Sequence, residues 1–69
     1  MDISKLNKIT RLDISIDHSQ KDVFLVTEDV DYICEIAKNA DGKWDIFNMP
    51  ENKTSYYSEV RNIINNIDQ

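Results

Sequence analysis

The chain of 69 residues is poor in the residue types that build flexible linkers, cross-links and ligand loops, with one glycine, one proline, one cysteine and one histidine. A single glycine excludes the glycine-rich loops that cradle phosphate groups. Cys34 alone excludes an intrachain disulfide, and Cys34 with His18 cannot assemble a zinc cluster. The longest apolar run is Val23–Val26, which is far too short to span a membrane.

The short length limits both the fold and the chemistry. We expect a single small domain over residues 1–69, and a chain of this size buries only about 60% of its unfolded surface on folding. Such a core has little room for a ligand pocket, so we expect no cofactor and no enzyme activity. The lone cysteine and the absence of an apolar signal-like N-terminus favour a cytoplasmic protein without membrane contact. The abundance of Ile, Asn, Lys and Asp suggests an AT-rich coding genome, bacterial or phage.

Alternation of apolar and polar residues predicts four strands. The segment Thr10–Asp17 alternates cleanly, which is typical of a half-buried strand. Its buried face is expected to carry Leu12, Ile14 and Ile16. The apolar run Val23–Thr27 is typical of a strand covered on both faces or at the centre of a sheet. The strands Tyr32–Lys38 and Lys43–Met49 follow, and the short connections favour an antiparallel meander.

The turn between the last two strands is the strongest local signal. Asn39, Asp41 and Gly42 fit a type I turn followed by a left-handed residue, which is the usual three-residue hairpin loop with a bulge. Gly42 is the only glycine and is expected to adopt a positive φ. This loop also determines the register, which places Ile36 opposite Ile46.

A helix is predicted after Pro50. Apolar residues recur at intervals of three and four, which is the spacing of one helix face. This face is expected to consist of Tyr56, Val60, Ile63, Ile64 and Ile67. We expect Thr54 or Ser55 to cap the first turn through its hydroxyl group. Residues 1–9 fit either one or two helical turns or an extended segment. The pattern therefore predicts an α+β fold, in which a four-stranded antiparallel meander carries a C-terminal helix on one face and a short N-terminal helical turn is possible.

The predicted register leaves large apolar side chains on both faces of the hairpin. One face is expected to carry Tyr32, Cys34, Ile36, Trp44 and Ile46. The other is expected to carry Ile33, Ala37, Phe47 and Met49, together with the acidic residues Glu35 and Asp45. A single helix covers only one face of such a sheet. Either the N-terminal segment covers the second face, or the apolar residues there stay partly exposed with Phe24 or Val26 beside them. Exposed apolar clusters tend to mark contact surfaces. The candidate partner-binding residues on this face are Ile33, Phe47 and Met49.

The net charge of −5 is unevenly distributed along the chain. The segment from Asp22 to Ala37, which we call the acidic window, contains no Lys or Arg. It either keeps the protein soluble or docks on a basic partner, in the extreme case by imitating nucleic acid. Direct binding of nucleic acid is not expected, because affinity for phosphates comes from Lys and Arg. The candidate partner-binding residues in the window are Glu28, Asp29, Asp31 and Glu35.

Three classes of function remain. The favoured hypothesis is a small acidic non-enzymatic protein-interaction module, an adaptor or inhibitor of a larger protein, with a phage gene as one of the origins considered. The second is a homodimeric structural subunit that associates through the hairpin edge or the apolar face. The third is a small-ligand or divalent-metal-binding domain that uses the Glu28–Asp31 turn, although this turn lacks the spaced ligands and central glycine of a calcium loop.

Overall fold

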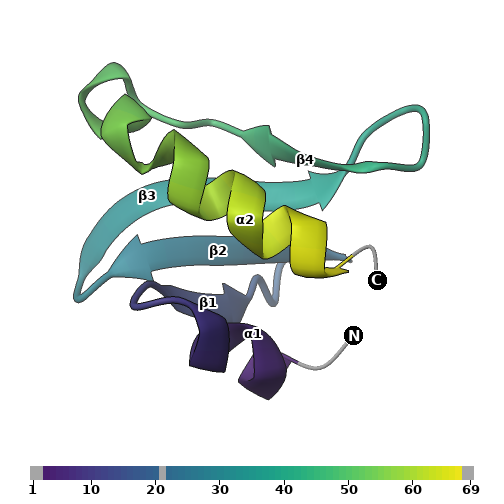
Figure 1. Ribbon diagram of the computed structural model, residues 1–69. Coiled ribbons are helices and arrows are strands. Elements are labelled where there is room, and N and C mark those ends of the chain that lie inside the picture. The colour runs from purple at the N-terminus through teal and green to yellow at the C-terminus, as the bar shows by residue number, and fades with distance from the viewer. Residues whose placement is uncertain (1–2, 21, 68–69) are drawn as a thin grey trace.

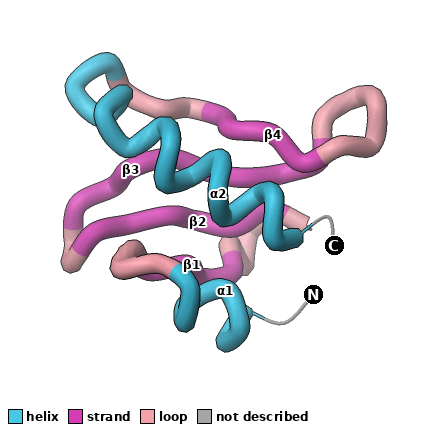
Figure 2. Tube along the Cα trace, in the orientation of Figure 1, coloured by secondary structure: helices cyan, strands magenta, loops and turns pink. Residues whose placement is uncertain are grey.

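The computed structural model describes residues 3–20 and 22–67 and shows a four-stranded antiparallel sheet with two helices packed on one of its faces (Figure 1). The elements are α1 (Ile3–Ile9), β1 (Asp13–Ile16), β2 (Val23–Glu28), β3 (Asp31–Lys38), β4 (Trp44–Phe47), the 3-10 helix η1 (Glu51–Tyr56) and α2 (Tyr57–Ile67). The strands lie in the order β1-β2-β3-β4, as Figure 2 shows along the chain trace. The predicted α+β meander with a C-terminal helix is confirmed.

The β3–β4 hairpin has the predicted loop and register. Gly42 has a φ of 75°, and its N–H donates to the carbonyl oxygen of Asn39 at 2.9 Å. The N–H of Asn39 donates to the carbonyl oxygen of Lys43 at 2.7 Å. The Asn39 side chain closes the loop further, since its Oδ1 accepts the N–H of Lys43 at 3.1 Å. Ile36 lies opposite Ile46, as expected.

The pairing of β2 with β3 contains a β-bulge at Ile33 that the sequence analysis did not predict. Val26 lies opposite Cys34, but Thr27 lies opposite Tyr32, so Ile33 has no partner on β2. The extra residue interrupts the alternation of side chains along β3. Ile33 therefore joins Cys34 in the core, and both are fully buried. The expectations that Ile33 lies on an exposed face and that Tyr32 shares a face with Cys34 are both wrong for this reason.

The core lies between the sheet and the two helices. In Figure 1, α2 crosses the sheet in front of β2 and β3, and α1 lies beside β1. The buried residues are Leu6, Leu12, Ile14, Val26, Ile33, Cys34, Ile36, Val60, Ile63 and Ile64. The N-terminal segment is thus helical, and it packs on the same face as α2. The predicted apolar face of the C-terminal helix is confirmed, but within residues 3–20 and 22–67 no element covers the second face of the sheet.

The C-terminal helical segment begins earlier than predicted. Helical structure starts at Glu51, directly after Pro50, whose φ of −63° suits helix entry. No side chain of the described residues caps this end, so the expectation that Thr54 or Ser55 caps the helix is wrong. Both hydroxyl residues already lie inside the 3-10 turn, and Thr54 Oγ1 donates backward to the carbonyl oxygen of Glu51 at 3.1 Å.

Two expectations for the first strands also need correction. Ile16 is 52% exposed, because it ends an edge strand and has a neighbouring strand on one side only. Phe24 and Val26 do not lie on the second face. Val26 is buried, and Phe24 packs against the core with its ring 5.5 Å from that of Trp44. The run that starts at Val23 nevertheless forms a central strand, as predicted.

Candidate functional site

Of the three apolar residues expected on an exposed face, only Phe47 is exposed. It ends β4 and is 38% exposed to solvent. Ile33 is buried, as described above, and Met49 is half-buried and packs against the core. Asn48 explains the position of Met49, since its φ of 59° ends the extended backbone and breaks the alternation after Phe47.

We call the sheet surface opposite the two helices the outer face. Across three of its four strands, β2, β3 and β4, the register places Leu25 next to Glu35 and Glu35 next to Phe47. Val23 lies next to Ala37 in the adjoining row. The aliphatic residues that share this face with Phe47 are therefore Val23, Leu25 and Ala37. The sequence analysis placed Ala37 on the face of Phe47, but Val23 and Leu25 are identified only by the pairing of β2 with β3.

Glu35 is fixed at the centre of the outer face by two hydrogen bonds. Its Oε1 accepts a hydrogen bond from Tyr32 Oη and another from Asn48 Nδ2, each at 3.1 Å. Burial, and next the hydrogen bond to Glu35, raise the pKa of Tyr32 to about 12. The bulge makes this contact possible, because it moves Tyr32 to the same face as Glu35. Both donors are thus brought to the carboxylate by irregular backbone.

A hollow of about 230 Å³ lies beside Glu35 on the outer face. It is lined by Gln20, Val23, Glu35, Ala37, Lys38, Phe47 and Asn48. The volume is below the roughly 300–1,000 Å³ of typical ligand pockets, so the hollow suits a single side chain better than a cofactor. Lys38 does not neutralise the carboxylate, since its Nζ lies 6.0 Å from the centre of the Trp44 ring and forms no ion pair with Glu35.

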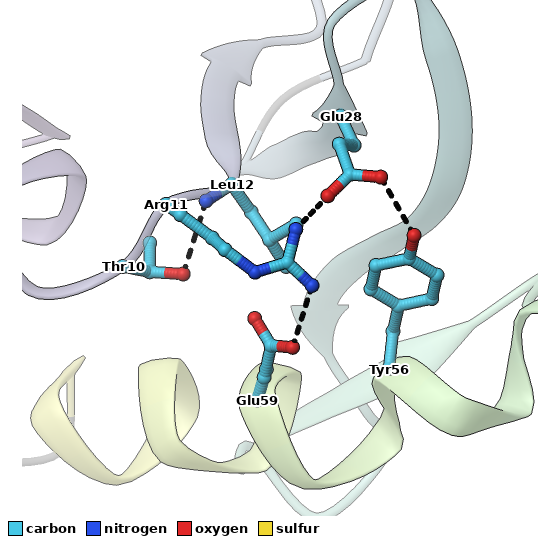
Figure 3. Close-up of polar contacts among 6 residues, drawn as sticks. All are labelled: Thr10, Arg11, Leu12, Glu28, Tyr56 and Glu59. Carbon is cyan, nitrogen blue, oxygen red and sulfur yellow. Dashed lines mark hydrogen bonds and ion pairs between the residues drawn. The ribbon is translucent and has the colours of Figure 1, made fainter.

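The structure does not gather the acidic window into one surface. Glu28 lies on the helix side, where it forms an ion pair with Arg11 and accepts a hydrogen bond from Tyr56 Oη at 2.7 Å (Figure 3). Arg11 also binds Glu59 at 2.9 Å, and this hydrogen bond raises the pKa of the guanidinium group. Glu28 thereby connects β2 to the segment before β1 and to the C-terminal helical segment. Its carboxylate has a structural role that competes with partner binding.

The other acidic candidates lie at the tip of the β2–β3 hairpin. Asp29 and Val30 form its two-residue loop, and Asp31 begins β3. Asp29 has a φ of 56°, a conformation that Asp tolerates better than most residues with a Cβ. Val30 is 96% exposed. Only Glu35 from the acidic window therefore lies on the outer face with Phe47.

No metal or nucleophilic centre emerges from these placements. Within the described ranges, no group of three His, Cys, Asp or Glu side chains is arranged to hold a metal ion. The Glu28–Asp31 turn therefore does not carry a metal proposal. Burial raises the pKa of the Cys34 thiol to about 11, which keeps it protonated and unreactive at neutral pH.

Comparison of the chain with protein-family models, with curated proteins and with solved structures finds no match in any of the three. Within residues 3–20 and 22–67, no helix has the length and apolar character needed to cross a membrane.

Proposed function

We propose that the chain is a small acidic protein-interaction module, an inhibitor or adaptor that binds a larger protein through its outer face. The observation that carries this proposal is the apolar group around Phe47 on a face that neither helix covers. An antiparallel sheet with one solvated face normally presents polar residues there. Interface hot spots are typically aromatic side chains surrounded by weaker contacts, and Phe47 with Val23, Leu25 and Ala37 fits that description.

The free edge of β1 argues against association through strand pairing. The N–H of Asp17 donates to the carbonyl oxygen of Val23. Because hydrogen-bonded pairs alternate along an antiparallel ladder, the N–H and C=O of Ile14 point away from β2. The Asn7 side chain from α1 binds both groups: its Oδ1 accepts the Ile14 N–H at 2.9 Å, and its Nδ2 donates to the Ile14 carbonyl at 3.1 Å. A strand of a partner would have to displace Asn7 to pair here.

The free edge of β4 is obstructed in a related way. The Asn39–Lys43 pair is hydrogen-bonded, so the N–H of Ile46 points toward the open edge. Asp45 Oδ1 accepts this N–H at 2.8 Å, and Arg61 Nη1 lies 3.4 Å from the same oxygen. Charged side chains on an edge strand hinder pairing with another chain. The outer face is therefore a better candidate interface than either edge.

A homodimer through the outer face is the competing arrangement. It would bring two copies of Glu35 and two net charges of −5 together, which opposes self-association. Light scattering on the purified protein tests this directly. A stable dimer that Phe47→Ser dissociates would replace the proposed module with a structural subunit.

Comparative capture tests the proposal itself. Wild-type protein, Phe47→Ser and Tyr57→Ser are immobilised, exposed to the same cell extract, and the retained proteins are quantified by mass spectrometry. Tyr57 is the matched control, because it is an exposed aromatic residue on α2, 51% exposed. We expect a partner that Phe47→Ser loses and Tyr57→Ser keeps, with at least about a 30-fold weaker Kd for the purified pair, which corresponds to a hot spot of about 2 kcal/mol.

The melting temperatures of the same variants complete the test. Phe47 is already partly exposed, so its truncation should leave a folded domain. If Phe47→Ser unfolds the protein, the ring belongs to the core and the proposed interface is wrong. Equal retention of every captured protein by the two variants would also refute it.

A further inference from the structure

Glu35 places a negative charge among the apolar side chains of the outer face. Its neighbours across the sheet are Leu25 and Phe47. No Lys or Arg in the described part of the chain forms an ion pair with it. A carboxylate that loses its water without gaining an opposite charge is strongly destabilised. A purely apolar partner surface therefore cannot cover this face without a large penalty.

The carboxylate is also oriented before any partner arrives. Tyr32 and Asn48 both donate to Oε1, and Oε2 accepts no hydrogen bond from residues 3–20 or 22–67. One oxygen is thus held in position while the other has its acceptor sites available to a ligand. An acceptor that is already oriented loses less conformational entropy on binding than a mobile surface carboxylate does.

We infer that the outer face receives an arginine side chain of the partner protein, whose guanidinium binds Glu35 while apolar residues beside that arginine pack on Phe47 and Val23. This inference rests on the proposed function and specifies the chemistry of the partner. The hollow of about 230 Å³ next to Glu35 provides the space for the side chain. Arginine fits better than lysine, because guanidinium is less strongly hydrated, donates through two parallel N–H groups and stacks on aromatic rings.

Charge complementarity supports the same occupant at longer range. The net charge of −5 attracts a basic surface before contact and raises the association rate. At close range Glu35 is the carboxylate of the acidic window that has apolar neighbours and no ion pair, since Glu28 is paired with Arg11. Asp29 lies at a hairpin tip away from the outer face and serves as a control for simple electrostatic attraction.

Peptide selection followed by a double-mutant cycle tests the inference. Random peptides displayed on phage are selected on immobilised wild-type protein, and the best binder is synthesised with arginine or with its neutral analogue citrulline. We expect arginine next to aromatic or aliphatic residues in the selected peptides. Replacing arginine by citrulline should weaken binding to the wild type about 10-fold, as for other charge-assisted hydrogen bonds, and should have little effect on Glu35→Gln. The matched control Asp29→Asn should retain the full 10-fold effect.

The outcomes separate this inference from the function on which it rests. The selected peptides could lack a basic residue and still bind the Phe47→Ser variant more weakly than the wild type. That result would refute the arginine inference and leave the outer face as the interface. An arginine effect that Asp29→Asn reduces as much as Glu35→Gln does would also overturn it. Peptides that bind Phe47→Ser as tightly as the wild type would refute both the arginine inference and the proposed function. If Glu35→Gln itself is unstable, Ala37→Arg provides the second test. Its arginine occupies the neighbouring outer-face position of β3 and should compete with the peptide for Glu35. Ala37→Arg should therefore weaken peptide binding more than Ala37→Gln does.

Discussion

Replacing Gly42 by the two enantiomers of alanine should change stability in opposite directions. Gly42 has a φ of 75°, and a Cβ added there would meet no atom within 4 Å. The effect therefore reports backbone conformation without steric clash. L-alanine in this region costs about 1–2 kcal/mol, whereas D-alanine prefers it. Either residue also restricts the unfolded chain, which stabilises the fold by about 0.4–1 kcal/mol. The two proteins should thus differ by about 1–2 kcal/mol, with D-alanine the more stable.

A chain of this length is accessible to chemical synthesis, so both variants can be melted side by side and followed by far-UV circular dichroism. One kcal/mol shifts the Tm of a domain this small by about 4–8 °C, so the difference is measurable. Ala40→Ser, in the same loop, should melt close to the wild type. Equal melting temperatures for the L and D variants would refute the left-handed loop, and with it the register that places Glu35 beside Phe47.

Three further predictions concern the core, the thiol and the β1 edge. Ile63→Ala should cost about 2–5 kcal/mol in chemical denaturation, because Ile63 is fully buried; Asn62→Ala on the exposed side of α2 should be nearly neutral, and the reverse order would contradict the helix orientation. Burial raises the pKa of Cys34 from 9.0 to about 11, so the folded state binds the thiol proton more tightly than the unfolded state does. The free energy of unfolding should therefore fall as the pH rises from about 9 to 11. The Cys34→Ala variant should show a smaller decline over this range. Asn7→Ala should cost about 1 kcal/mol and should increase self-association in light scattering, because it frees the backbone of Ile14.

The parts of the fold that the sequence predicts are those controlled by local patterns. Gly42 and Asn39 determine the hairpin loop through backbone preferences alone, and the register of β3 with β4 follows from that loop. The spacing from Val60 to Ile64 identifies the buried face of α2 in the same way. Neither inference requires knowledge of the tertiary contacts of these residues.

The errors arise where tertiary contacts override such patterns. The bulge at Ile33 depends on the pairing of β2 with β3, and nothing in the local sequence marks the extra residue. Strict alternation therefore assigned Ile33 to the exposed face and Tyr32 to the core. The same limitation hid the contact between Tyr32 and Glu35. Glu28 was assigned to a docking surface because its partner Arg11 is 17 positions earlier in the chain.

The distribution of apolar residues over the outer face argues that it is more than a consequence of small size. Two short helices cannot cover both faces, since α2 with 11 residues is roughly 17 Å long. If a shortage of covering elements were the whole explanation, every strand should show a similar outer face. Instead β1 presents the exposed polar residues Asp13 and Ser15, whereas β2 and β4 present Leu25 and Phe47. The apolar side chains lie on the strand of Glu35 and on the two strands beside it, and this distribution supports the proposed interface.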